Sequence, residues 1–204
     1  GNNIGAEGAR QVACLFRTGK DLGRRRSRSA KSAQALKEAP EEKHLHTLNL
    51  SRNQIFGEGA ILIASTLAAK AFMVTNLDLS GNGIGDEAAE ALARGIAQNS
   101  SLQTLDLRMN NLTNSGARAV AEAVIHRGEG QWHAFNGVLF TDQKQMKAPD
   151  IDYSRCNMGP AGVMVLAGWL DRSKLLPTSL VLSDNRLLVE GMEALSRAFR
   201  PNRA

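Results

Sequence analysis

The densest group of chemically active side chains is GRRRSRSAKS at residues 23–32, which holds four arginines and a lysine. Guanidinium and ammonium groups at this density are typical of arms that bind nucleic acid or another anionic surface, and also of targeting signals. The alternative is a solvated loop inserted into a fold built for another purpose. The candidate phosphate-binding residues are Arg24, Arg25, Arg26, Arg28 and Lys31.

The excess positive charge of the chain is confined to this region. Its formal net charge is +5, yet residues 17–37 carry eight of the 25 basic residues and one of the 20 acidic residues. The rest of the chain therefore has a formal charge near −2. A general phosphate-binding surface is not indicated, and nucleic-acid binding stays an alternative that depends on the arginines alone.

Other reactive side chains do not form a recognisable site. His44 and His46 lie two positions apart without a cysteine or carboxylate at metal-binding spacing, so we expect a solvated pair. Cys14 and Cys156 are far apart, which favours a reduced, intracellular setting. No nucleophile motif frames a serine. We therefore expect no enzyme activity, no cofactor, no metal and no small-molecule substrate.

Composition predicts a single folded domain over residues 1–204. Hydrophobic residues make up 43% of the chain and charged residues 22%, which suffices for a substantial core. No apolar run approaches the roughly 20 residues that cross a bilayer.

An internal repeat dominates the sequence. NLDLSGNGIGDEAAEALARGI at 76–96 has counterparts at 47–67, 104–124, 150–170 and 179–199, and residues 2–16 match its second half. The copies align without gaps on one anchor position, occupied by Asn2, Asn53, Asn82, Asn110, Cys156 and Asn185. About six to seven repeats are expected, counting one irregular unit.

Two periodicities follow each other within every copy. Apolar residues stand two apart before the anchor, as in Leu77 and Leu79, which predicts a short strand. Seven, ten, eleven and fourteen positions after the anchor they form one face of a helix. A strand–helix unit of 28 or 29 residues cannot bury its apolar face alone. The sequence therefore predicts an α/β solenoid with an inner parallel sheet and outer helices.

The pattern L-x-x-L-x-L-x-x-N/C followed by x-I-G-x-x-G-A resembles the long, ribonuclease-inhibitor-type leucine-rich repeat. This type also occurs in the Ran GTPase-activating protein and in NOD-like receptors. The resemblance implies a curved right-handed horseshoe segment in which the anchor side chains bond neighbouring turns as a ladder. The ladder residues would be Asn53, Asn82, Asn110, Cys156 and Asn185.

Two segments depart from the repeat. Residues 18–40 contain the arginine cluster and are expected to be a basic insertion between repeats. Residues 126–150 are an irregular short repeat or insertion, with Trp132 and Phe135 in the leucine columns and Phe140 at the anchor. A hairpin outside the solenoid is the alternative. We expect these aromatic side chains to fill the core and not to form a ligand platform.

The function that this architecture favours is a non-catalytic protein-interaction scaffold or subunit of a larger assembly. Its binding surface would be the concave face or the open N-terminal edge. The concave face is small, polar and mildly acidic, which disfavours nucleic acid and suits a basic or polar protein patch. Regulation of a GTPase is a second alternative, implied by the family resemblance alone. The concave residues are Thr47, Asn49, Ser51, Asn76, Asp78, Ser80, Thr104, Asp106, Arg108, Asp152, Ser154, Val181 and Ser183.

The two ends of the solenoid are expected to differ. The first unit lacks its strand, so its apolar edge should be open to preceding sequence or to another chain. Pro201 follows the last helix, so the C-terminal edge should be finished.

Overall fold

A computed structural model describes residues 5–17, 45–69, 73–140, 150–173 and 177–200. Its helices are α1 (Gly5–Arg17), α3 (Phe56–Leu67), α4 (Asp86–Gln98), α5 (Asn114–Arg127), α7 (Gly159–Ser173), α8 (Leu188–Ala198) and the short 3-10 helix η2 (Glu129–Gln131). Its strands are β1 (Thr47–Asn49), β2 (Asn76–Asp78), β3 (Thr104–Asp106), β4 (Ala134–Phe135), β5 (Val138–Leu139), β6 (Asp150–Asp152) and β7 (Ser179–Val181).

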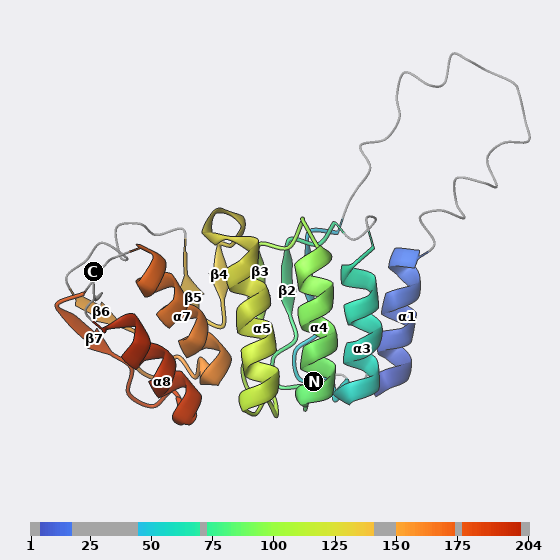
Figure 1. The fold of residues 1–204 in the computed structure, drawn as a ribbon. Coiled ribbons are helices and arrows are strands. Elements are labelled where there is room, and N and C mark those ends of the chain that lie inside the picture. Colours follow the sequence, from blue (N-terminus) through green and yellow to red (C-terminus); the bar gives the residue numbers. More distant parts are fainter. Residues whose placement is uncertain (1–4, 18–44, 70–72, 141–149, 174–176, 201–204) are drawn as a thin grey trace, which may run out of the picture.

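The helices stand side by side in one row, with the strands behind them as a second layer (Figure 1). Strands β1 to β4 form a parallel sheet in chain order, and β6 pairs in parallel with β7 in a second sheet. Each described helix packs against the next one along the chain. The predicted α/β solenoid with an inner parallel sheet and outer helices is confirmed.

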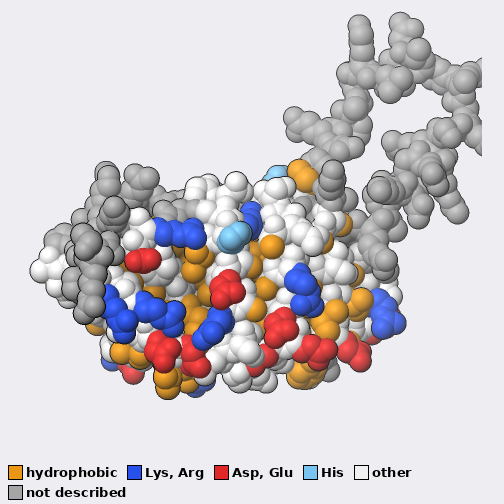
Figure 2. All heavy atoms as spheres, in the orientation of Figure 1, with side chains coloured by type: hydrophobic (Ala, Val, Ile, Leu, Met, Phe, Trp, Pro, Cys, Tyr) orange, Lys and Arg blue, Asp and Glu red, His pale blue; other side chains and the backbone are white. Residues whose placement is uncertain are grey.

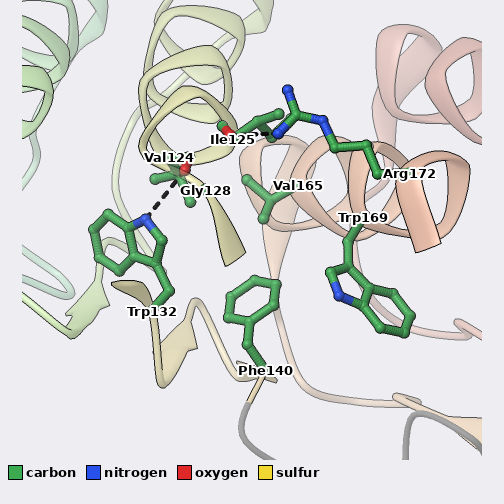
Figure 3. A pocket seen from close by; sticks show the side chains of 9 residues that line it. Val124, Ile125, Gly128, Trp132, Phe140, Val165, Trp169 and Arg172 are labelled. Carbon is green, nitrogen blue, oxygen red and sulfur yellow. Dashed lines mark hydrogen bonds between the residues drawn. The ribbon is translucent and has the colours of Figure 1, made fainter. Parts of the chain in front are cut away.

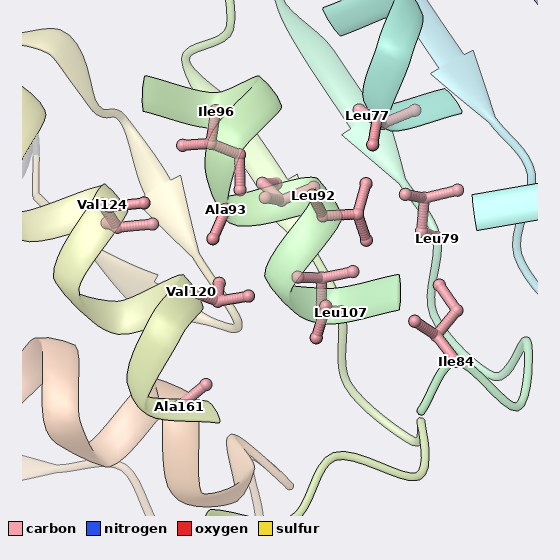
Figure 4. Close-up of a cluster of buried hydrophobic side chains, with 14 of the residues drawn as sticks. Leu77, Leu79, Ile84, Leu92, Ala93, Ile96, Leu107, Val120, Val124 and Ala161 are labelled. Atoms are coloured by element: carbon pink, nitrogen blue, oxygen red, sulfur yellow. The ribbon is translucent and has the colours of Figure 1, made fainter. Parts of the chain in front are cut away.

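The core lies between these two layers. Parallel pairing places Leu77 beside Leu48 and Leu105, with Leu77 and Leu105 fully buried. The helices meet these leucines with the predicted apolar face, as Leu92 and Ile96 of α4 illustrate in Figure 4. The apolar side chains of the strands, which recur every second residue, therefore enter the core from one side. Those of the helices, which recur with a period of 3.6, enter the same core from the opposite side.

Adjacent helices approach closely where the residue six positions after the anchor is small. A Cβ atom added to Gly116 would lie 2.4 Å from Oδ1 and 2.8 Å from Cα of Asp86, and 3.0 Å from Cβ of Ala89. The corresponding atom on Gly59 would lie 3.0 Å from Cβ of Ala9. The contact between neighbouring helices, and not phosphate binding, thus explains why Gly59 and Gly116 are glycines.

The sheet is interrupted where the repeat pattern fails. Strand β4 continues the parallel sheet, with Phe135 opposite Leu105 as predicted. Asn136 and Gly137 then adopt left-handed backbone conformations, φ 47° and 85°, and turn the chain into the antiparallel strand β5. Asn-Gly is the preferred pair for such a tight hairpin.

The prediction that Phe140 occupies the anchor is wrong. Asn136 takes over part of that role, because its Oδ1 accepts a hydrogen bond from the backbone N–H of Leu107 at 2.7 Å. The hairpin alternative describes this turn correctly, although β4 belongs to the solenoid sheet. The segment 141–149, for which a helix-poor connection was expected, lies outside the described residues.

Helix stacking continues across this interruption. Helix α7 packs directly against α5, and residues 161–167 of α7 are all buried. Their sequence, AGVMVLA, is apolar on every side, which is typical of a helix enclosed by its neighbours. The solenoid therefore keeps its helical layer where its sheet divides.

Candidate protein-interaction surface

The strands present two rows of polar side chains on the face opposite the helices. Parallel register aligns Thr47 with Asn76 and Thr104 in one row. It aligns Asn49 with Asp78 and Asp106 in the other. All six residues are partly or fully exposed, since their side chains alternate with the buried leucines. The second sheet adds Asp152 opposite Val181.

Four side chains of these rows are engaged in the turns that follow their strands. Oδ1 of Asp78 accepts the backbone N–H of Ser80 at 2.9 Å, and Oδ1 of Asp152 accepts that of Ser154 at 2.8 Å. Asn49 and Asp106 bond Ser51 and Arg108 in the same way. The residue at this position, an aspartate in three of these strands and Asn49 in β1, thus forms an Asx turn that ends its strand. At Asp152 the hydrogen bonds from the backbone and side chain of Ser154 lower the pKa.

Arg108 links the two sheets on this face. Its Nη2 lies 2.6 Å from Oδ2 of Asp106, and its Nη1 donates to the backbone oxygen of Cys156 at 3.0 Å. Hydrogen bonding to Asp106 raises the pKa of Arg108 despite partial burial. Charged hydrogen bonds made at two points restrict the orientation of the guanidinium group. Arg108 therefore has a structural role in addition to the binding role predicted for it.

The anchor asparagines bond the turn of the preceding repeat. Oδ1 of Asn82 accepts backbone N–H groups of Asn53 at 2.8 Å and Ile55 at 3.4 Å. Its Nδ2 donates to the backbone oxygens of Leu50 and Leu79 at 2.8 and 2.9 Å. These bonds occupy backbone groups that the turn geometry leaves without partners of their own.

Asn110 and Asn185 repeat this arrangement. Asn110 accepts from the backbone of Asn82 and Ile84. Asn185 accepts from Met158 and donates to Tyr153 at 2.6 Å. Asn53 donates to Ser51, while Cys156 contributes its backbone oxygen to Arg108.

A second asparagine position was not singled out from the sequence. Asn99 ends α4 and is buried; its Nδ2 donates to the oxygen of Leu67 in the preceding helix at 2.9 Å. Its Oδ1 accepts from the backbone of Ser101 and Leu102. The signal available in the sequence was an asparagine between a helical pattern and the turn residues Ser100 and Ser101.

Comparison with known proteins agrees with this geometry. The sequence model of the family described as Leucine Rich repeat matches residues 42–64, 70–93 and 98–121. These three segments contain β1, β2 and β3. The chain is a leucine-rich-repeat protein. Its long strand–helix units assign it to the ribonuclease-inhibitor-like type, as the sequence pattern predicted.

Three relatives support the assignment of this leucine-rich-repeat chain. It is 27% identical over 161 residues, 78% of its length, to NACHT, LRR and PYD domains-containing protein 13 of Homo sapiens. It is 26% identical over 153 residues, 75% of its length, to NACHT, LRR and PYD domains-containing protein 14 of Mus musculus. Over 94 residues, 46% of its length, it is 35% identical to RAN GTPase-activating protein 2 of Arabidopsis thaliana. The matched region spans 14%, 14% and 17% of these relatives.

Several predicted residues of the leucine-rich-repeat chain fall outside the described part. These are the basic insertion with Arg24, Arg25, Arg26, Arg28 and Lys31, and also His44. His46 is described and exposed, and its backbone oxygen accepts bonds from Thr75 and Asn76. Among the described residues no group of three histidine, cysteine or acidic side chains could hold a metal ion. Within the same residues no helix is long and apolar enough to span a membrane.

Two of the three aromatic residues of the irregular segment fill the core, as predicted, while Phe140 is partly buried and packs against it. Trp132 and Phe135 are buried, and Nε1 of Trp132 donates to the backbone oxygen of Val124 at 3.1 Å. The guanidinium of Arg127 lies 4.6 Å from the centre of the Trp132 ring. A cavity of about 20 Å³ remains between this region and α7, with Val165 and Trp169 on its far side (Figure 3). That is the space of about one water molecule.

Proposed function

We propose that this leucine-rich-repeat segment is a non-catalytic protein-interaction module that binds its partner on the concave face of β1, β2 and β3. Leucine-rich repeats imply a protein-interaction domain. The observation that carries the more specific proposal is the register of the three strands, which aligns six partly or fully exposed polar side chains in two rows. A rigid, extended polar surface of this kind suits recognition of a folded protein or peptide.

The row that contains Asn76 and Thr104 is the better candidate for contacts that determine specificity. Neither side chain is needed for an Asx turn, whereas Asp78 and Asp106 close the turns after their strands. Arg108 bonds both carboxylate oxygens of Asp106, whereas in the described part of the chain Asp78 has no such arginine partner, and its side chain is partly exposed. We therefore expect a partner with a basic or polar patch to contact this region.

The test compares a concave variant with a convex one. Asn76→Lys/Thr104→Lys adds charge to the binding rows, while Glu90→Lys/Glu87→Lys changes exposed residues of α4 on the opposite side. Affinity capture followed by mass spectrometry should lose the specific partners with the concave variant and keep them with the convex one. Equal retention by both variants would reject the concave face as the binding surface.

The same capture tests the arginine alternative. A chain lacking residues 20–32, compared with the full chain at low and moderate salt, should retain the same proteins. If nucleic acid dominates the captured material and is lost with salt or with the deletion, the basic insertion carries the function instead. We expect an intracellular setting, since Cys156 is a free cysteine in the turn after β6.

A second candidate function is regulation of a GTPase. The observation that favours it is the 35% identity to RAN GTPase-activating protein 2 over 94 residues. GTP hydrolysis by Ran, measured with and without the chain, decides it: acceleration would establish this function, and an unchanged rate would remove it.

A further inference from the structure

A small notch lies between the turn that follows β3 and the start of α7. It has a volume of about 40 Å³ and is lined by residues 107–110 and Leu112 on one side, and by Asn136 and residues 158–161 on the other. The sheet divides at this place, because the chain turns from β4 into the antiparallel strand β5 after Phe135. The notch therefore borders the one turn of the first sheet that a hairpin follows in place of a regular unit.

At a regular junction, the anchor asparagine of the following unit completes the turn before it. Oδ1 of Asn82 accepts the backbone N–H groups of Asn53, the preceding anchor, and of Ile55, two positions after that anchor. Nδ2 of Asn82 donates to the backbone oxygen of Leu50, three positions before the same anchor. One primary carboxamide thus bonds two donors and one acceptor of the preceding turn.

The next junction has the same three contacts. Oδ1 of Asn110 accepts the backbone N–H groups of Asn82 and Ile84, and its Nδ2 donates to the backbone oxygen of Leu79. The positions are again the preceding anchor, the residue two after it and the residue three before it. The turn after β3 should present the same groups at Asn110, Leu112 and Leu107.

No described residue supplies a carboxamide to these groups. The irregular unit contributes Asn136, but its Oδ1 accepts the N–H group of Leu107 and its Nδ2 donates to the backbone oxygen of Met158. Within the described part of the chain, the backbone N–H groups of Asn110 and Leu112 have no acceptor. The backbone oxygen of Leu107 accepts one bond, from Nδ2 of Asn110, and a carbonyl oxygen has two lone pairs.

The exposure of this turn differs from that of the regular turns. Ile55, Ile84 and Met158 stand two positions after their anchors and are fully buried. Leu112 stands in the same column and is partly exposed, as is its anchor Asn110. A ligand can therefore reach this turn from solvent.

Oriented hydrogen-bonding groups, and not net charge, favour one kind of ligand here. Arg108 lines the notch, but its guanidinium already bonds Asp106 and the backbone oxygen of Cys156. On the helical face, acidic and basic side chains of the described residues lie intermingled, so this face presents no large area of one sign (Figure 2). A carboxamide combines an acceptor oxygen with an NH₂ donor, whereas a carboxylate has no donor for Leu107.

The volume of the notch suits a group of this size. A water molecule needs about 10–15 Å³ of such space, so the notch admits about three water-sized atoms. A carboxamide group consists of one carbon, one oxygen and one nitrogen atom. It fits without any movement of the helices.

We propose that this notch binds the side-chain carboxamide of an asparagine or glutamine on a partner polypeptide, in the position that the following anchor holds at regular junctions. The ligand oxygen accepts the N–H groups of Asn110 and Leu112, and the ligand NH₂ group donates to the oxygen of Leu107. The site consists of backbone groups of a turn. It is thus independent of the function proposed above, which uses side chains of the strands.

Nuclear magnetic resonance titration of the full 204-residue chain tests the site. The probes are asparagine, glutamine, aspartate and alanine, each capped as its N-acetyl methylamide. Capped asparagine and glutamine should shift the amide resonances of Asn110 and Leu112 with half-saturation at roughly 1–10 mM, as expected for ligands of about a dozen non-hydrogen atoms. Capped aspartate and alanine should bind about tenfold more weakly or less, because neither offers both an acceptor and a donor. The amides of Asn53 and Ile55 already bond Asn82 and are the internal controls.

Hydrogen exchange measures the same groups without relying on a shift. In the absence of ligand, the amides of Asn110 and Leu112 should exchange roughly 100-fold faster than those of Asn53 and Ile55. Capped asparagine at ten times its half-saturating concentration should slow them about tenfold, since about one site in eleven is then free.

The concave variant Asn76→Lys/Thr104→Lys should leave the titration and the exchange rates unchanged, so the two proposals can fail separately. Slow exchange of Asn110 and Leu112 without ligand would show that the chain itself already bonds them and would overturn the proposal. Equal binding of all four capped amino acids, shifts spread over many amides of the chain, or no binding of capped asparagine would overturn it as well.

Discussion

The regular and irregular parts of the solenoid solve one hydrogen-bonding problem in different ways. In the regular part, Asn82 bonds two backbone N–H groups and one backbone oxygen of the preceding repeat, and also the backbone oxygens of Leu79 and Ser80 in its own turn. In the irregular part, Asn136 accepts from Leu107 and donates to Met158 at 3.2 Å. Asn136 thereby bonds residues on both sides of the division between the two sheets.

The difference shows what the repeat requires. A parallel strand beside β3 would offer backbone oxygens to β3 along its whole length, but the hairpin turns β4 away after Phe135. The carboxamide of Asn136 supplies the missing acceptor. Helix packing is less demanding, since α5 and α7 meet directly although their anchors lie 46 residues apart. The helical layer thus tolerates an irregular insertion, while the strand layer needs a compensating side chain.

The largest effect is expected at the regular ladder. Asn82→Ala removes acceptors and donors for several buried backbone groups, and each group left without a partner is costly. We expect the free energy of unfolding to fall by about 3 kcal/mol. Urea denaturation followed by circular dichroism measures it. Asn111→Ala, an exposed asparagine one position after the next anchor, is the control and should change stability by less than about 0.5 kcal/mol.

A smaller loss is expected at the irregular junction. Asn136→Gly keeps the left-handed turn but removes both hydrogen bonds, and should cost about 1.5 kcal/mol. Asn136→Ala should cost about 1 kcal/mol more, because alanine is strained at positive φ. Hydrogen exchange should show the amides of α7 and α8 losing protection before those of α4. An equal loss in all three helices would mean that Asn136 does not join the two parts.

Within the regular part of the solenoid, Asp86 makes a contribution to stability that depends on pH. Its carboxylate accepts the backbone N–H of Thr113 at 2.8 Å and the hydroxyl groups of Thr113 and Ser115, at the start of α5. Burial alone would raise the pKa of Asp86, but these hydrogen bonds outweigh it and lower the pKa below 3.8. Because the pKa of Asp86 is lower in the folded chain than in the unfolded chain, its carboxylate stabilises the fold at pH values above its ordinary pKa. This stability is lost as the pH falls through the folded-state pKa.

Asp86→Asn should therefore destabilise the chain by about 1 kcal/mol at pH 7, as expected for loss of a helix-capping carboxylate. The difference from the wild-type chain should shrink as the pH falls through and below 3.8. Thermal unfolding at pH 7, 5 and 3.5 measures it. A difference that is the same at every pH would show that the charge of Asp86 has no part in the effect.

The smallest effect concerns the turn that all repeats share. The residue before the anchor has positive φ in every described unit, and it is Gly81 in one repeat and Met109 in the next, with φ 66° and 58°. Met109 is 57% exposed, so Met109→Gly loses little packing and relieves backbone strain. We expect a gain of roughly 0.5 kcal/mol, and a loss of about 1 kcal/mol for the reverse change Gly81→Ala. Changes of the same sign would contradict this explanation.

Much of the fold could be predicted because it repeats. Six aligned copies fix which residues face the core, and the register of β1, β2 and β3 follows from stacking equal units. The anchor column also indicated which side chains bond the turns, and the same alignment named the concave residues. Their use in binding stays a prediction, as does any role of the arginine-rich insertion.

The irregular features could not be obtained in this way, because they depend on contacts between units that differ. The alignment placed Phe140 at the anchor by counting from Trp132, whereas the tight Asn136–Gly137 turn displaces it and leaves the bonding to Asn136. The bond from Arg108 to Cys156 crosses 48 residues, and the sequence does not indicate it.

The sequence by itself thus determined the repeat, its two periodicities and the core, since local hydrophobic spacing specifies which face of each strand and helix is buried. Tertiary structure alone decided where the sheet divides and which acidic side chains close turns. These features arise where one unit meets another, so they depend on contacts between units and not on the sequence of a single repeat.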